Sequence, residues 1–383
     1  MTTERRQLVA VGGAYAAQQF GYGALVTALP ALRDRSSLSD GDLSLVMLGV
    51  IIGAACGSIL AERVAVRWGS RQALVAALAV QGVALALVTV AVPVALLVPS
   101  LVLVGLGLGG IDASYNMQAS LTEQRLGRPV LGRLYAAGTF AAIVATGVTA
   151  GALALGLPAV AALVVAVLLH ATVAVRGVRD LDPRRAAHRV EERRSDRTPL
   201  PTGAIVAVGS VVFAAFVVDA VVSTWGTVLA TDELRLADAR TPLLYMTYLA
   251  ASLVARLLTD RAVLAAGRVR VGVVAGSVGA VGCVVIAWSG AVPLVVLGFA
   301  AAGIASGCLV PLAFSRAGEL VPGRSDEVIA RVNLFNYAAA VLGGALPGVV
   351  AEVARLGLAF LLPAAALVVC IPLLRTLRRR VPS

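Results

Sequence analysis

Apolar residues run along almost the whole chain in stretches long enough to cross a membrane, and short polar segments separate them. A membrane-spanning helix needs about 20 mainly apolar residues to cross a hydrocarbon layer about 30 Å thick. Twelve stretches meet this requirement, which predicts an all-α membrane protein with twelve transmembrane helices. The predicted spans are residues 7–30, 43–61, 72–91, 95–119, 133–155, 158–175, 202–230, 242–258, 271–288, 292–314, 328–351 and 357–374.

The composition agrees with this pattern. Of the 383 residues, 59% are hydrophobic and 14% are charged, whereas an average soluble domain carries about a quarter charged residues. An ordinary soluble enzyme is therefore excluded. The chain has 32 Lys and Arg residues against 21 Asp and Glu residues, and every one of the 32 is an arginine.

The distribution of these arginines predicts the orientation of the chain. Cytoplasmic loops of membrane proteins are enriched in Lys and Arg, and most arginines collect on one side if both termini are cytoplasmic. That choice leaves outside only Arg33, Arg35, Arg235, Arg240 and Arg355. We therefore expect a multi-pass protein of the cytoplasmic membrane with both ends inside, in contact with membrane lipid.

The longest polar segment lies at the middle of the chain. Residues 177–200 mix arginine with acidic residues and proline and contain few large apolar side chains, as a flexible cytoplasmic linker does. The segment includes His188, expected to be solvated, and has no aromatic residue that would suggest nucleic-acid binding. The expected domains are an N-terminal bundle of six helices, residues 1–176, and a C-terminal bundle of six, residues 201–383.

The sequence predicts neither a cofactor nor a metal site. The four cysteines lie far apart inside apolar runs, where we expect small buried side chains rather than disulfides or metal ligands. A chain without lysine also lacks the lysine of a phosphate-binding loop, which excludes an ATP-driven pump.

A short motif is repeated after the second predicted helix of each half. The first copy is GSILAERVAVRWGSR, residues 57–71, and the second is ARLLTDRAVLAAGR, residues 255–268. A small residue, an acid, an arginine and a Gly-x-Arg ending resemble the loop motif of the major facilitator superfamily. The resemblance implies two pseudo-symmetric bundles, secondary active transport and no enzymatic activity. It assigns to an inner gate Glu62, Arg63, Arg67, Gly69, Arg71, Arg256, Asp260 and Arg261.

The first copy departs from that pattern at one position. Val66 stands where the acid usually lies, and Glu62 lies one helical turn earlier on the same face. We hypothesise that Glu62 shares the charge pairing of the inner gate with Asp260. The alternative is that Glu62 only extends its side chain to the membrane surface.

A narrower resemblance concerns the fourth and seventh predicted spans. The segment GLGLGGIDASYNMQASLTEQRLGRP, residues 105–129, and the pair Asp219 and Trp225 resemble the fucose-type sugar permeases of bacteria. In that branch a histidine usually opens the fifth span, where this chain has Tyr135. The resemblance implies that a small organic solute, sugar-like by preference, is moved together with a proton.

Asp112 and Asp219 are the acids that lie deep within the predicted spans. An ionisable side chain inside a bilayer is costly and by default serves a function, and burial disfavours its charged form. We therefore expect both to couple transport to protons, Asp112 first. Gly105 and Gly109 precede Asp112 at helical spacing, which predicts close approach of a neighbouring helix. The alternative is a carboxyl group that only ties helices together.

Other polar side chains within the spans could contact a substrate. Amides and phenols suit a neutral hydroxylated or aromatic solute, although each could instead form hydrogen bonds between helices. Trp225 could also lie in the outer aromatic belt, and His170 is expected at the membrane interface. The predicted substrate contacts are Gln18, Gln19, Tyr22, Asn116, Tyr135, Ser223, Trp225, Asn333, Asn336 and Tyr337.

These features favour a proton-coupled carrier that takes up a small solute by alternating access of its two halves. Two alternatives stay open. The same acids would serve a proton-coupled antiporter that exports drugs or metabolites, because a cationic solute could pair with Asp219. A receptor or scaffold built on a carrier fold, without transport, belongs to another class.

Overall fold

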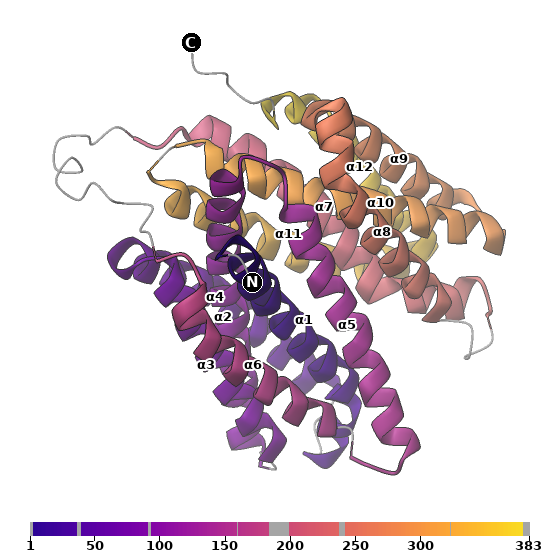
Figure 1. The fold of residues 1–383 in the computed structure, drawn as a ribbon. Helices are drawn as coiled ribbons and strands as arrows, with labels where there is room; N and C mark the ends of the chain where they lie inside the picture. The colour runs from indigo at the N-terminus through magenta and orange to yellow at the C-terminus, as the bar shows by residue number, and fades with distance from the viewer. Residues whose placement is uncertain are drawn as a thin grey trace. The chain divides into compact units, whose positions relative to one another are not determined.

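The computed structural model describes residues 3–36, 40–90, 93–158, 160–183, 199–236, 242–321 and 323–377. Within these ranges the chain forms twelve α-helices, one for each predicted span (Figure 1). They are α1 Thr3–Arg35, α2 Asp40–Trp68, α3 Ser70–Val90, α4 Val94–Leu126, α5 Leu131–Ala154, α6 Ala161–Asp180, α7 Thr202–Val228, α8 Pro242–Ala266, α9 Arg268–Trp288, α10 Val292–Glu319, α11 Ser325–Val353 and α12 Leu361–Cys370.

Short irregular helices extend two of these elements. A π-helical turn, Leu229–Glu233, continues α7, and 3₁₀ turns at Leu356–Phe360 and Pro372–Leu377 flank α12. Most of the predicted linker, residues 184–198 with His188, lies outside the described residues, as do Arg240 and residues 378–380. The predicted linker and domain boundaries stay predictions.

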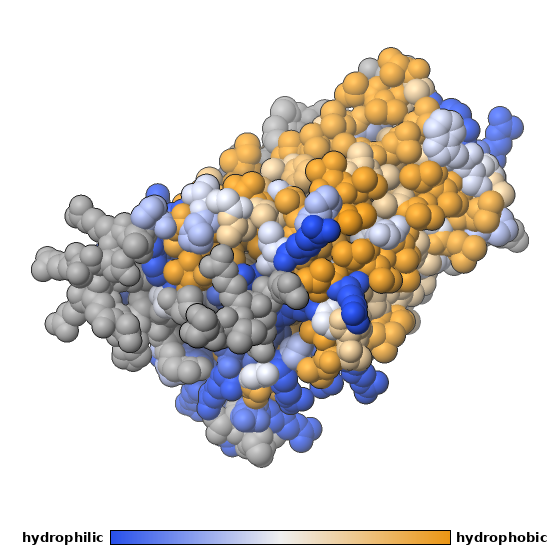
Figure 2. Space-filling view, turned by 90° about the horizontal axis from the view of Figure 1, so that it is seen from above, coloured by the Kyte–Doolittle hydropathy of each residue, from blue (hydrophilic) through white to orange (hydrophobic). Residues whose placement is uncertain are grey.

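The helices have the length and surface of a membrane protein. Among the described residues, nine are long and apolar enough to cross a bilayer. Of the other three, α1 and α8 carry more polar residues, and α12 forms part of a shorter apolar helical segment. Hydrophobic side chains dominate the exposed helix faces (Figure 2), as contact with lipid tails requires.

The chain divides into two compact units. Unit 1 contains residues 1–128, 137–198 and 321–330, and unit 2 contains residues 129–136, 199–320 and 331–383. The division follows the two halves of the sequence except at two helix starts. The first turns of α5 belong to unit 2, and the first turns of α11 belong to unit 1.

Both units repeat one scheme of helix packing. In unit 1, α4 packs against α1, α2 and α3, and α6 packs against α1 and α3. In unit 2, α10 packs against α7, α8 and α9, and α12 packs against α7 and α9; α9 and α12 lie side by side in Figure 1. Each pairing in the second unit is that of the first with six added to both numbers, which is the internal repeat expected of many transporters.

Glycines allow the tightest of these pairings, between α2 and α4. A Cβ atom on Gly105 or Gly109 would overlap the main chain of α2 at Val50 or Ala54, and one on Gly57 would overlap the main chain of α4 at Leu106. The predicted close approach at Gly105 and Gly109 is confirmed. In unit 2, Gly303 and Gly307 of α10 lie against the main chain of α8 in the same way.

Several helices extend beyond the predicted spans and bring further acids into the bundles. Glu123 in α4 and Asp260 in α8 are buried, and Glu319 ends α10. Hydropathy marks the part of a helix inside the hydrocarbon layer, but the helix continues to its last hydrogen-bonded turn. One expectation about cysteine is wrong, because Cys56 is exposed on α2 while the other three are buried.

Candidate functional site

Asp112 lies on α4 and is partly buried against α1. The amide nitrogen of Gln18 donates to Asp112 Oδ1 at 2.6 Å and to the main-chain oxygen of Leu108 at 3.2 Å. Asn116, a predicted substrate contact, lies one turn further along α4, and its side-chain amide donates to the main-chain oxygen of Asp112 at 2.7 Å. The partner of this carboxyl group is therefore a glutamine from another helix, 94 residues away in the sequence.

Aromatic rings lie on the same two helices. Tyr15 of α1 stacks on Tyr115 of α4, with the ring centroids 4.4 Å apart. Gly138 of α5 leaves room for the Tyr15 ring, because a Cβ atom there would overlap it. Gln19 is half-buried and Tyr22 is exposed, whereas Gln18 is 1% exposed. The predicted substrate contacts Gln18 and Tyr22 thus lie in different surroundings.

Asp219 on α7 has a partner that sequence reasoning missed. The hydroxyl of Tyr248, a buried residue of α8, donates to Asp219 Oδ1 at 2.7 Å. The available signal was the pair Tyr245 and Tyr248, which lie on one face of α8 and stack with centroids 6.1 Å apart. Asp219 is thus held within unit 2 by a neutral donor.

Two predicted substrate contacts, Ser223 and Trp225, follow Asp219 on the same helix. Ser223 is exposed and donates to the main-chain oxygen of Ala220 on its own helix. The indole nitrogen of Trp225 donates to the main-chain oxygen of Gly344 on α11 at 3.0 Å, and the ring lies close to Gly348. Trp225 therefore joins α7 to α11.

The remaining predicted substrate contacts lie in unit 2. On α11, Asn333 donates to the hydroxyl of Tyr337 at 3.2 Å; both are buried, and Asn336 is half-buried. Tyr135 is buried at the start of α5. The guanidinium of Arg256 lies 5.5 Å from the centre of the Tyr135 ring, and the same ring stacks with Phe314 of α10. A cation over an aromatic face is an attractive arrangement, and it explains how a tyrosine is accommodated at this position.

The second copy of the gate motif contacts the start of α5. Asp260 accepts hydrogen bonds from the main-chain nitrogens of Gly132 and Arg133, at 3.1 and 3.3 Å, and lies 3.8 Å from the Arg133 side chain. Helix N-termini present unpaired N–H groups and partial positive charge, which bind carboxylates. Gly132 permits the approach, because a Cβ atom there would lie 2.5 Å from the main-chain oxygen of Arg256. Arg261 is exposed.

The first copy of the motif ends α2 and reaches the end of α6. Gly69 has a φ angle of 102°, which suits glycine and ends α2. Arg71 donates to the main-chain oxygen of Val178 at 3.3 Å, and Arg67 lies over the ring of Trp68. Arg63 is exposed and Glu62 is half-buried. The gate role proposed for Glu62 stays a prediction.

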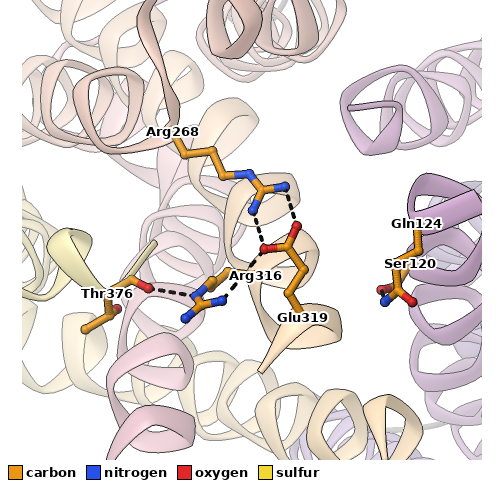
Figure 3. Close-up of polar contacts among 6 residues, drawn as sticks. All are labelled: Ser120, Gln124, Arg268, Arg316, Glu319 and Thr376. Carbon is orange, nitrogen blue, oxygen red and sulfur yellow. Dashed lines mark hydrogen bonds and ion pairs between the residues drawn. The ribbon is translucent and has the colours of Figure 1, made fainter. Parts of the chain in front are cut away.

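Sequence reasoning missed a cluster at the ends of α9 and α10 (Figure 3). Arg268, which the arginine distribution places on the cytoplasmic side, is buried and forms two hydrogen bonds with Glu319, at 2.7 and 2.9 Å. Arg316 lies 3.7 Å from the same carboxylate and donates to the main-chain oxygen of Thr376. One carboxylate thus joins the start of α9 to the end of α10 and, through Arg316, to the turn after α12. The only signal was an acid and two arginines near predicted helix ends.

A second polar cluster was also missed, in unit 1. Gln118 of α4 exchanges two hydrogen bonds with the main chain of Asp182, both at 3.0 Å, and donates to Ser70. Gln7 of α1 donates to Thr122 of α4 and to the Asp182 carboxylate. These contacts fasten the residues that follow α6 to the bundle.

His170, expected at the membrane interface from its sequence position, faces the interior of unit 1. It is fully buried, and its ring nitrogens lie near Gln81 of α3 and the main chain of α6. Position in the sequence gives the depth of a residue in the membrane, but the side that it faces is set by helix packing.

The structure contains two repeated units of apolar helices, and inside each unit polar partners hold carboxyl groups. These features define the class of helical membrane carriers. A family model, described as the Major Facilitator Superfamily, matches residues 11–237 and 207–383. The chain belongs to this family: it is a multi-pass membrane protein and a secondary transporter, and not an enzyme.

Two bacterial relatives are similar over most of their length. One is an uncharacterized MFS-type transporter of Yersinia pestis, 24% identical over 340 residues, or 89% of this chain and 88% of the relative. The other is an uncharacterized transporter of Sinorhizobium fredii, 29% identical over 281 residues, or 73% of each chain.

Solved structures show the same fold. The Escherichia coli fucose:proton symporter matches with a TM-score of 0.80 at 12% identity, over 99% of this chain and all of the other. The human organic anion transporter MFSD10 matches with a TM-score of 0.78 at 13% identity, over 98% of this chain and all of the other. A proton:xylose symporter matches with a TM-score of 0.71 at 15% identity, over 96% of this chain and 94% of the other.

Proposed function

We propose that the protein couples transport of a small organic solute to protons, that its direction is uptake, and that the solute is sugar-like. The observation that carries the coupling is the carboxyl group of Asp112 inside α4, held at 2.6 Å by an amide from α1. A group of this kind can take up and release a proton at membrane depth, where an ionisable residue is functional by default. The fold of the fucose:proton symporter and the sequence resemblance to fucose-type permeases support the choice.

The two acids differ in their proposed roles. Asp112 carries the transported proton, because the Gln18 amide can donate to its ionised form and, after rotation, accept from its protonated form. Asp219 takes the second role, because its partner Tyr248 is a phenol that can also donate or accept. The proposed substrate contacts are the amides and phenols of α1 and α11 together with Asn116, Tyr135, Ser223 and Trp225.

The start of α5 supplies the proposed inner gate. Asp260 holds the N-terminal turn of α5 through two main-chain hydrogen bonds, and alternating access requires that this contact form and break in each cycle. We expect Asp260→Asn to weaken the contact and to shift the balance between inward-facing and outward-facing states, measured by spectroscopic distances between labels. Glu62→Ala should shift this balance between the two states in the same direction. A shift with Asp260→Asn alone would show that Glu62 takes no part in the inner gate.

The experiment that tests the function is a flux assay in proteoliposomes. Purified protein is reconstituted with an imposed pH gradient of either sign, and labelled sugars, polyols and organic cations are offered in turn. The proposal expects a sugar-like solute to accumulate on the side toward which protons flow. Movement of a cation against the proton flow would instead establish a drug or metabolite antiporter, and flux that is indifferent to the pH gradient would overturn proton coupling.

A further inference from the structure

His170 is a fully buried histidine whose two ring nitrogens both lie near oxygen atoms. Nδ1 lies 2.8 Å from the main-chain oxygen of Ala166, and Nε2 lies 3.1 Å from Gln81 Oε1. The packing around the ring is tight, because a Cβ atom on Gly21 of α1 would come within 2.9 Å of the ring and one on Gly82 of α3 within 3.1 Å of His170 Cβ. Three helices are therefore built around this imidazole.

Two proton arrangements satisfy the geometry. A doubly protonated ring donates to both oxygens. A neutral ring donates from Nδ1 to the main-chain oxygen of Ala166. Its Nε2 then accepts from Gln81, provided that the Gln81 amide is turned by half a rotation. Such a turn is possible because the oxygen and nitrogen of an amide are nearly equivalent in shape. The two arrangements differ by one proton and by a half-turn of the Gln81 amide. The pair is therefore a bistable element.

The Gln81 amide of this pair and the Gln18 amide of α1 each have one atom without a partner. Within the described part of the chain, Gln81 Nε2 and Gln18 Oε1 are buried and have no hydrogen-bond partner. A Cβ atom on Gly107 of α4 would lie 2.6 Å from Gln81 Cβ, and the Gln18 amide binds the main-chain oxygen of the next residue, Leu108. The base of the Gln81 side chain and the amide of Gln18 therefore lie beside consecutive residues of the same turn of α4.

We propose that the two amides, bridged by one internal water molecule, form a hydrogen-bonded relay from Asp112 through Gln18 and Gln81 to His170. The relay makes His170 a second proton-binding group in unit 1. A buried water needs two to four polar partners and commonly satisfies otherwise unpaired groups. It can donate to Gln18 and either accept from or donate to Gln81, so it fits both orientations of the Gln81 amide.

The relay links the charge on His170 to the charge on Asp112. The contacts of His170 described above are with Gly21 of α1, with Gly82 and the Gln81 amide of α3 and with the main chain of α6, and Asp112 on α4 is the charged group at the far end of the relay. A negatively charged Asp112 favours the doubly protonated ring of His170. Protonation of Asp112 removes that charge and favours release of a proton from His170. The inference rests on the proposed function in one respect, that Asp112 exchanges a proton.

Nuclear magnetic resonance of the histidine nitrogens tests the relay without any transport assay. The chain has 2 histidines, so in a His188→Ala background ¹⁵N-labelled histidine reports His170 alone. In lipid bilayers over a pH series, the ratio of doubly protonated to neutral His170 at a given pH should fall about fivefold in Asp112→Asn, because the variant removes a unit negative charge from the far end of the relay in a partly shielded interior. Gln18→Leu, which interrupts the relay and keeps the carboxyl group, should also change this ratio.

The matched control is Asp180→Asn, which removes an acid from the end of the same helix, α6. It should leave the His170 signals unchanged. Equal titrations in the Asp112→Asn and Asp180→Asn proteins, or a ring that stays neutral at every pH in all of them, would overturn the relay. Failure of the proposed function has a different signature, because the His170 titration would respond to Asp112→Asn while solute flux stayed independent of pH.

Discussion

At the residue scale, the informative side chains are acids that find a neutral donor inside the bundle. Asp112 is bound by the Gln18 amide and Asp219 by the Tyr248 hydroxyl. A buried polar group costs free energy unless it is hydrogen-bonded. For both acids a neutral partner meets that need, and on Asp219 the charge of Arg256 acts as well. Such pairs can be stable in both protonation states, which a coupled carrier requires.

The pair of Asp219 and Tyr248 gives a prediction about stability. Tyr248→Phe removes the donor and leaves the shape of the ring, so the carboxyl group of Asp219 loses its hydrogen bond inside the bundle. Loss of a hydrogen bond to a charged or buried group costs about 1.5–3 kcal/mol. We expect a lower midpoint in thermal unfolding of the detergent-solubilised protein.

Tyr245→Phe is the matched control, because it changes the neighbouring ring of the stacked pair. It should affect the midpoint less than Tyr248→Phe. If both variants unfold at the wild-type temperature, the hydrogen bond to Asp219 contributes nothing to stability and the account of this pair is wrong.

The sequence identified the two acids but not their partners. Asp112 and Asp219 stand out because acids are rare within apolar spans, and this rarity is visible in one dimension. The contact between Gln18 and Asp112 depends on how α1 and α4 are rotated against each other, which no local pattern encodes. The burial of His170 and Arg268 could not be read from the sequence for the same reason, because it depends on how the helices pack.

At the element scale, the packing of α2 against α4 depends on glycine. Apolar side chains gain little from leaving lipid for another helix, so close contact of main chains and good packing must hold the bundle together. Gly57, Gly105 and Gly109 provide that contact. The spacing of glycines was readable from the sequence, whereas the partner helix was not.

A substitution at Gly109 measures this contribution. Gly109→Val places side-chain atoms where the main chain of α2 at Ala54 now lies, so the helices must separate. We expect a loss of about 3 kcal/mol or more, the range of severe overpacking, measured by reversible unfolding or as a reduced yield of monodisperse protein.

Gly147→Val on α5 serves as the control. A Cβ atom at Gly147 would meet no described atom within 4 Å, so the substitution should be tolerated. Equal losses in the two variants would indicate that valine is harmful for reasons other than the contact between α2 and α4.

At the scale of the whole molecule, two units share one packing scheme, and the predicted orientation places their connecting linker in the cytoplasm. Hydropathy predicted all twelve helices because span length is dictated by the bilayer. It underestimated the ends of α4, α8 and α10, because these helices continue beyond the hydrocarbon layer. The orientation depends on the arginine distribution alone and requires its own measurement.

Labelling of single cysteines from outside the cell tests this orientation. Arg128, in the loop after α4, and Leu157, in the loop after α5, are both exposed and are predicted on opposite sides. In a cysteine-free background, a membrane-impermeant maleimide should label Leu157→Cys in intact cells and Arg128→Cys only in inverted vesicles. The reverse pattern would invert the topology, and with it the predicted cytoplasmic location of the gate.

The central claim is that Asp112 carries the coupled proton, and the comparison of accumulation with exchange tests it most directly. For the solute identified in proteoliposomes, Asp112→Asn should abolish accumulation driven by a pH gradient while leaving exchange of labelled for unlabelled solute near the wild-type rate. Asp180→Asn should retain both activities. Accumulation by Asp112→Asn at the wild-type level would contradict the claim.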